Sequence, residues 1–172
     1  MNKIELYKMI EDFSGKVGKS SSFLPYVTPI EDYVYNSDWK IIPYDDFKLI
    51  KVSKDGFTVF KDGKYNIFIR KYGTKILRQR FTLAHEVGHI VLNHHKVYKQ
   101  SNKILIEEEA NIFAENILMP VDFVERFRYE DTETIARIFQ VSKQMAKVRL
   151  AHIQRDKCYF NILNKWRQIL CR

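Results

Sequence analysis

In the segment His85-Glu86-Val87-Gly88-His89, two histidines lie four positions apart with a glutamate beside the first. Apolar residues recur at intervals of three and four between Lys75 and about Leu92, so this segment is predicted to lie on a helix. Residues i and i+4 share one helix face, which lets both imidazoles reach a single metal ion. Glu86 would then lie near the ion, where it can act as a general base toward a water molecule. A chance occurrence of this pattern is rare for this composition, at roughly 0.014 per chain.

A zinc site needs a third protein ligand, and the sequence offers two candidates. The first is His95, ten residues after His85, as in the pattern H-E-x-x-H-x-x-G-x-x-H. That pattern requires a glycine for the sharp turn after the second histidine, and this chain has Leu92 there. His95 is therefore expected to be an exposed loop residue rather than a ligand.

The second candidate is a glutamate from a helix predicted between Leu105 and Met119. Positions 107, 108 and 109 are all glutamate. On a helical wheel Glu107 lies roughly 60° from the centre of the apolar face, Glu109 roughly 100° and Glu108 roughly 160°. Glu107 is thus expected to point most nearly into the protein and to be the third ligand, with Asn111 as a hydrogen-bond partner of a ligand. Two imidazoles and one carboxylate favour Zn²⁺.

The flanking segments predict an opening helix over residues 3–18 and a β-hairpin. The hairpin follows from two β-prone runs between Phe57 and Arg70 that flank Asp62-Gly63, a dipeptide suited to a tight turn. The short segment Trp39–Pro43 has no clear class. Together with the helices, this pattern predicts an α+β fold.

The segment Thr134–Leu150 has the pattern of a helix-turn-helix, although Gln140 stands at the turn position where glycine is frequent. We therefore predict a metal-binding domain over residues 1–128 and a helical extension over residues 129–172 packed on it.

The formal net charge of +8 is unevenly distributed. Residues 141–172 contain eight Lys or Arg and one Asp, whereas residues 105–134 contain nine acidic residues and two Arg. A basic tail can bind DNA or an acidic partner. We favour the simpler interpretation, a solvated helix face that keeps the protein soluble.

Cysteine usage and hydropathy predict a cytoplasmic protein. Cys158 and Cys171 are not in C-x-x-C spacing and are expected to be reduced thiols. No apolar run approaches the about 18 residues that a membrane helix needs. Residues 1–11 lack the apolar core of a signal peptide.

Two stretches of the chain resemble the ImmA/IrrE-type metallopeptidases. Arg80–Leu92 is similar to the family's R-F-T-L-A-H-E-x-G-H block. Glu107–Pro120 is similar to its E-x-x-A-N-x-F-A-x-x-L-L-M-P block, with Ile117 in place of the usual leucine. The resemblance covers residues 65–120 strongly and extends more loosely to about residue 155. It implies a small zincin-like fold in which Glu107 is the carboxylate ligand.

The resemblance also implies a function. Members of the family cut, or are needed for cutting, helix-turn-helix transcriptional repressors, which relieves repression of mobile elements, prophages or stress responses. We therefore expect a zinc-dependent endopeptidase with Zn²⁺ on His85, His89 and Glu107, Glu86 as the base, and such a repressor as its partner. Two alternatives stay open: a metal-containing DNA- or protein-binding regulator without turnover, and the protease-like toxin half of a toxin–antitoxin pair.

Two details of the expected chemistry concern the substrate. The strand near Tyr65–Arg70 is expected to pair with an extended substrate segment. A second donor to the developing oxyanion is expected among Tyr65, His94, Tyr98 and His152, which the sequence does not rank.

Overall fold

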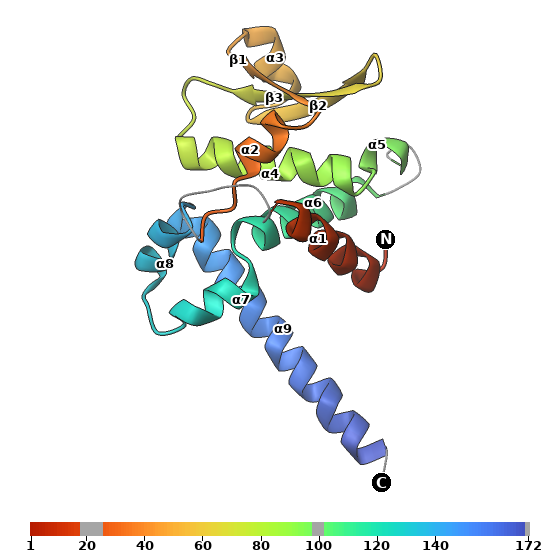
Figure 1. Cartoon of the computed structure of the whole chain (residues 1–172), viewed down its shortest axis with the longest axis vertical. Coiled ribbons are helices and arrows are strands. Elements are labelled where there is room, and N and C mark those ends of the chain that lie inside the picture. The colour runs from red at the N-terminus through yellow and green to blue at the C-terminus, as the bar shows by residue number, and fades with distance from the viewer. Residues whose placement is uncertain (18–25, 98–101, 171–172) are drawn as a thin grey trace.

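The computed structural model describes residues 1–17, 26–97 and 102–170, with all their side chains except those of residues 96–97 and 157–170. In chain order the elements are α1 (Lys3–Val17), α2 (Ile30–Tyr35), β1 (Lys40–Tyr44), α3 (Phe47–Val52), β2 (Gly56–Lys61), β3 (Lys64–Arg70), α4 (Ile76–Val91), α5 (His94–Val97), α6 (Lys103–Leu118), α7 (Val121–Val124), a 3-10 turn (Glu125–Phe127), α8 (Thr132–Ile138) and α9 (Lys143–Leu170). A small sheet lies at one end of the molecule with most of the helices beneath it (Figure 1). This arrangement confirms the predicted α+β, zincin-like fold.

The sheet has the strand order β1-β3-β2 within the described residues. β2 and β3 form the predicted hairpin, and Asp62 and Gly63 at its turn take the positive φ angles that a tight turn requires, 52° and 76°. β1, from the unclassified segment Trp39–Pro43, pairs in parallel with β3. In this sheet β3 is therefore hydrogen-bonded on both sides, whereas β2 lies at an edge.

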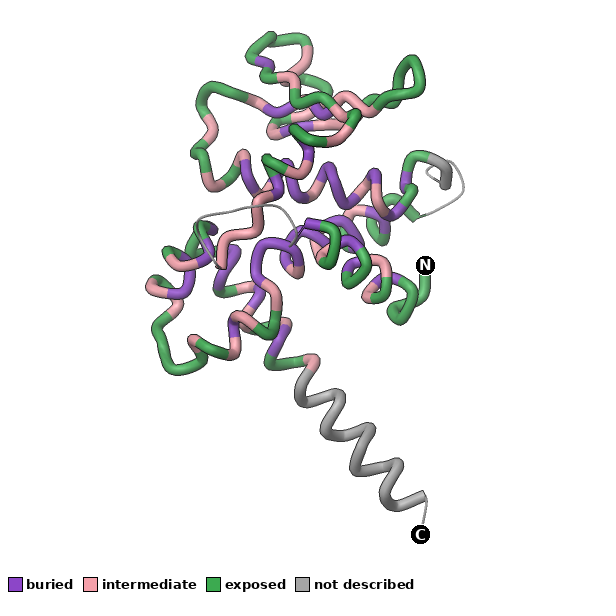
Figure 2. The backbone as a smooth tube through the Cα atoms, in the orientation of Figure 1, coloured by how far each residue is buried: buried purple, intermediate pink, exposed green. Residues whose placement is uncertain are grey.

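The core includes the contact between α4 and α6. Gly88 of α4 faces Phe113 of α6, which is completely buried, and a Cβ atom at position 88 would lie 3.0 Å from the Phe113 ring. Glycine at this position therefore permits the close approach of the two helices, which brings the histidines of α4 next to the glutamates of α6. Figure 2 shows that many residues along α4 and α6 are buried.

The predicted helical pair at Thr134–Leu150 is α8 and the beginning of α9. Gln140 between them takes a left-handed conformation with φ 50°. Its amide donates to the Arg137 carbonyl at 3.2 Å, and the amide of Val141 donates to the Ala136 carbonyl at 2.9 Å, which is the Schellman helix ending. The turn thus forms with glutamine in place of glycine. Although α9 is long, no helix in the described part of the chain combines the length and apolar character needed to span a membrane.

Arg80 of α4 connects three parts of the chain. Its side chain is 8% exposed, and its guanidinium donates to the carbonyls of Thr28 at 2.6 Å, Phe139 at 3.3 Å and Gln140 at 3.4 Å. Glu31 of α2 lies 3.5 Å from its Nε. Arg80 therefore holds the motif helix against both the N-terminal region and the turn of the helical pair.

We expect Arg80→Met to lower the free energy of unfolding by about 2–3 kcal/mol, because the buried Phe139 carbonyl and the partly buried bonds to Thr28 and Gln140 lose a charged donor. Urea unfolding followed by circular dichroism measures this. The matched control is Arg78→Met, two residues away, where an exposed ion pair with Asp55 at 2.6 Å is lost. That loss should cost no more than about 1 kcal/mol. Equal effects of the two substitutions would contradict a structural role for the Arg80 hydrogen bonds.

Candidate metal centre

Three side chains from α4 and α6 converge on one point. His85 and His89 lie one turn apart on α4, and their Nε2 atoms are 3.0 Å apart. The carboxylate of Glu107 on α6 lies 3.3 Å from His85 Nε2 and 3.8 Å from His89 Nε2. One potential ligand atom from each residue falls within a 4.8 Å cluster. The structure thus brings together the three residues that the sequence indicates as metal ligands.

The hydrogen bonds of the two rings direct their Nε2 atoms toward this point. Asn111 Oδ1 lies 3.0 Å from His85 Nδ1, and His94 Nδ1 lies 2.9 Å from His89 Nδ1. An amide oxygen can only accept, so Nδ1 of His85 carries the hydrogen in this bond. Lone pairs on the two Nε2 atoms and a carboxylate this close repel one another unless a proton or a cation lies between them. The donor set therefore fits a divalent cation such as zinc.

The ionisation of these groups also suits a metal. Burial and the neighbouring His85 ring lower the pKa of His89 to about 4, so this imidazole is neutral near neutral pH. A hydrogen bond with His85 lowers the pKa of Glu107, which keeps its carboxyl ionised. A neutral imidazole and a carboxylate are the forms that coordinate metal ions.

Glu86 lies beside the three residues but is held by a different contact. Its side chain is buried, and its Oε2 accepts a hydrogen bond from Thr58 Oγ1 of β2 at 2.8 Å. Burial raises the pKa of the Glu86 carboxyl, an effect that the Thr58 hydrogen bond and the electrostatic interaction with His85 oppose. A carboxylate with a raised pKa accepts a proton more readily, which suits a general base.

The helical-wheel ranking of the three consecutive glutamates was wrong. Glu109 is the most buried of them, at 6% exposed, whereas the Glu107 side chain is 43% exposed. Glu109 faces His94 at 3.1 Å and the Met1 amino group at 3.3 Å, while Glu107 faces an open cavity. The wheel assumed a single buried direction, but α6 packs against α4, α1 and α9, so two of its faces are covered.

His95 lies outside the cluster. Leu92 keeps φ −80°, and the left-handed conformation falls on Asn93 instead, with φ 56°. His95 is exposed, and its ring lies 3.0 Å from the Tyr65 hydroxyl and is stacked near Phe60. Its neighbour His94, by contrast, is buried and contacts His89. The sequence did not predict this contact, because the two residues are five positions apart and α4 ends between them.

A cavity of about 560 Å³ opens over the cluster. Its walls include Gly56, Phe57, Thr58 and Phe60 of β2, together with Tyr65 of β3 and Phe81 of α4. The predicted pairing of Tyr65–Arg70 with a substrate is wrong, because β3 is hydrogen-bonded on both sides. Among the residues that the structure describes, β2 is the strand at the cavity whose outer edge pairs with no other strand.

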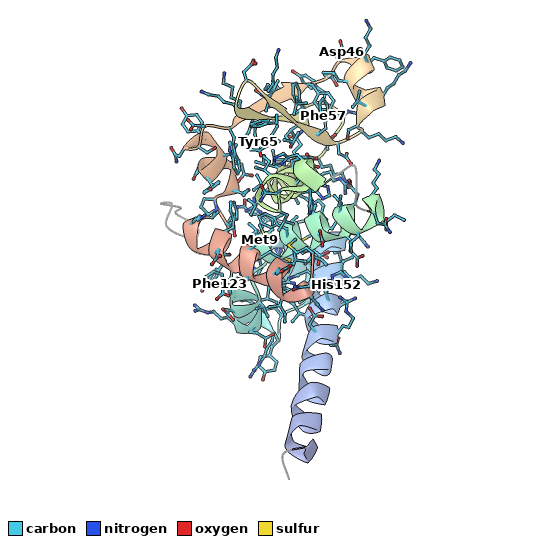
Figure 3. All side chains as sticks on the ribbon, turned by 90° about the vertical axis from the view of Figure 1, so that its right-hand side faces the viewer. Met9, Asp46, Phe57, Tyr65, Phe123 and His152 are labelled. Carbon is cyan, nitrogen blue, oxygen red and sulfur yellow. The ribbon has the colours of Figure 1, made fainter. Side chains whose placement is uncertain are left out.

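The structure also separates the candidates for a second oxyanion donor. Tyr65 and His94 line the cavity, but both ring nitrogens of His94 face other protein groups. His152 lies on α9, where it is bonded to Glu115 at 2.7 Å, well away from Tyr65 (Figure 3). Tyr98 lies outside the described residues. Tyr65 is therefore the remaining candidate at the cavity, and its hydroxyl lies 3.0 Å from the ring of His95, which also lines the cavity.

Comparison with known families gives one match. The family of metallopeptidases described as the IrrE N-terminal-like domain, peptidase family M78, matches residues 41–151. The chain belongs to this family. The match begins in β1, contains every residue of the ImmA/IrrE-type site described above and runs past residue 128 into α9. No curated protein matches the chain.

Proposed function

We propose that this ImmA/IrrE-family protein is a zinc-dependent endopeptidase. The observation that carries the proposal is the convergence of His85, His89 and Glu107 beside the buried carboxylate of Glu86, at the floor of an open cavity. Two imidazoles and one carboxylate with an accessible fourth position are typical of catalytic zinc. When bound, the ion supplies Lewis acidity for the scissile carbonyl and for the attacking water.

The protein's own groups account for the proton transfers. Glu86 accepts the proton of the attacking water and then delivers it to the leaving amine. Thr58 donates to one Glu86 oxygen, which leaves the other oxygen available to take the proton. The Tyr65 hydroxyl, whose pKa burial raises, stays protonated and can donate to the carbonyl oxygen as negative charge develops there.

An extended substrate is proposed to pair with the open edge of β2. Backbone hydrogen bonds to an edge strand fix the register of a peptide without requiring a particular side chain. Thr58 lies on this strand, so pairing there would place the peptide backbone close to Glu86.

The proposed partner is a helix-turn-helix repressor whose cleavage relieves repression of a mobile element, a prophage or a stress response. This proposal rests on family membership. The protease-like toxin of a toxin–antitoxin pair shares the same site and differs in its target.

A regulator without turnover is the alternative function, and one observation favours it. α8 and α9 are two helices joined by a tight turn, and two lysines are exposed near the start of α9: Lys147 and Lys143, which is paired with Glu133 at 2.9 Å. Binding of duplex DNA with a steep salt dependence, unchanged by a chelator, would support that alternative.

Metal content tests the proposed site directly. Protein purified without added metal should contain about one zinc per chain, because the ligand set matches that ion. A strong chelator should abolish cleavage of a fluorogenic peptide library, and added zinc should restore it. Elemental analysis of the purified protein decides the first point. A zinc content near zero, with no uptake on titration, would refute the proposal.

A further inference from the structure

We propose that His94 is a positioning residue that, together with Glu109, sets the tautomer and direction of the His89 ring. The inference rests on the metal site proposed above and adds two residues to it. The family match and the motif spacing assign no role to either of them.

His89, His94 and Glu109 form a continuous chain of hydrogen bonds. His94 Nδ1 lies 2.9 Å from His89 Nδ1, and His94 Nε2 lies 3.1 Å from Glu109 Oε2. His94 is 2% exposed and Glu109 is 6% exposed, so water does not compete for the bond between them, whereas His89 is half-buried. The other oxygen of Glu109 is paired with the Met1 amino group.

The donor and acceptor groups of His89, His94 and Glu109 determine which ring nitrogens carry hydrogens. The Glu109 carboxylate can only accept, so Nε2 of His94 carries a hydrogen. With Nε2–H donated to Glu109, neutral His94 has a lone pair at Nδ1 and accepts the Nδ1–H of His89. The Nε2 lone pair of His89 then points at the position between His85 and Glu107. A hydrogen on His94 Nδ1 would reverse this order and place a hydrogen on His89 Nε2, which would block the site.

The two histidine ligands are thus supported in different ways. His85 donates to the neutral amide of Asn111, whereas His89 donates to an imidazole that is itself bonded to a carboxylate. A carboxylate at the end of such a chain makes the ligating nitrogen more basic and fixes the ring plane. Removing the hydrogen bond between His94 and His89 should therefore lower the zinc affinity of the protein by more than a packing defect alone would.

Zinc affinity, measured by competition with a chelator, tests the role. His94→Leu should weaken binding by about tenfold to a hundredfold, as is usual when the hydrogen-bond partner of a ligand is removed. His94→Asn places an amide oxygen near the position of Nδ1 and should recover most of that loss. The matched control His95→Leu removes the adjacent histidine and should leave zinc affinity unchanged. Long-range ¹H–¹⁵N spectra of the zinc-loaded protein should show His89 with Nδ1–H and His94 with Nε2–H.

The outcomes separate this inference from the proposed function. If the unmodified protein takes up no zinc, the metal site itself is refuted, and the role of His94 with it. If it binds zinc and His94→Leu binds equally well, only the role of His94 is refuted. Equal losses in the Leu and Asn variants, or the opposite tautomer of His89, would likewise show that His94 contributes packing and not orientation.

Discussion

Glu86→Gln is expected to lower the rate of peptide cleavage by at least about a hundredfold, because glutamine cannot accept the proton of the attacking water. The substitution preserves the size of the side chain and leaves an amide oxygen to accept the hydrogen bond from Thr58. Fold and zinc content should therefore be unchanged. Initial rates on a fluorogenic peptide and on a co-expressed repressor, with elemental analysis of the same preparation, provide the measurement.

Two results would contradict the role of Glu86. Loss of zinc in the Gln variant would indicate that the carboxylate is a ligand. Full activity with zinc bound would show that another group takes the proton. Thr58→Val is a useful companion, since it removes only the hydrogen bond that orients Glu86 and should reduce the rate by a smaller factor.

Glu107→Ala is expected to abolish stable zinc binding, because it removes the carboxylate nearest the two Nε2 atoms, at 3.3 and 3.8 Å. The loss of affinity should exceed the about tenfold to hundredfold that follows removal of an outer hydrogen-bond partner. Zinc content after dialysis against a weak chelator measures the effect. The neighbouring variant Glu108→Ala, which removes an exposed glutamate from the same helix turn, is the matched control and should retain the metal.

His95→Ala should also retain the metal, because His95 lies at the cavity rim against Tyr65. The reverse pattern, with metal lost in His95→Ala and kept in Glu107→Ala, would mean that the cavity rearranges to a histidine-only site. The turn at Leu92–Asn93 argues against such a rearrangement, since Leu92 does not take the left-handed conformation that would redirect the chain.

The parts of the fold that depend on nearby residues could be predicted from the sequence. The positions of His85 and His89 on one helix face follow from four-residue spacing, and the hairpin follows from Asp62-Gly63 between β-prone runs. Both patterns involve residues that are close along the chain, so the local backbone geometry decides them.

The features that the sequence did not reveal depend on contacts between distant segments. Glu109 contacts the Met1 amino group and His94, and the position of β2 at the sheet edge depends on the pairing of β1 with β3. The hydrogen bonds of Arg80 to Thr28 and Phe139 join residues more than fifty positions apart. A helical wheel or a propensity scale includes none of these partners.

If a substrate pairs with the edge of β2, as proposed above, this mode of binding restricts the conformation that the target can have when it is cut. A polypeptide pairs with an edge strand only when its own amides and carbonyls are free, so a segment within a folded helix must first unwind. Its cleavage rate would then follow the fraction of time that the segment is open, provided that opening and closing are fast compared with cutting. Any ligand that binds only the folded target lowers that fraction. The lifetime of a target would therefore depend on its local stability as much as on the residues around the cleaved bond.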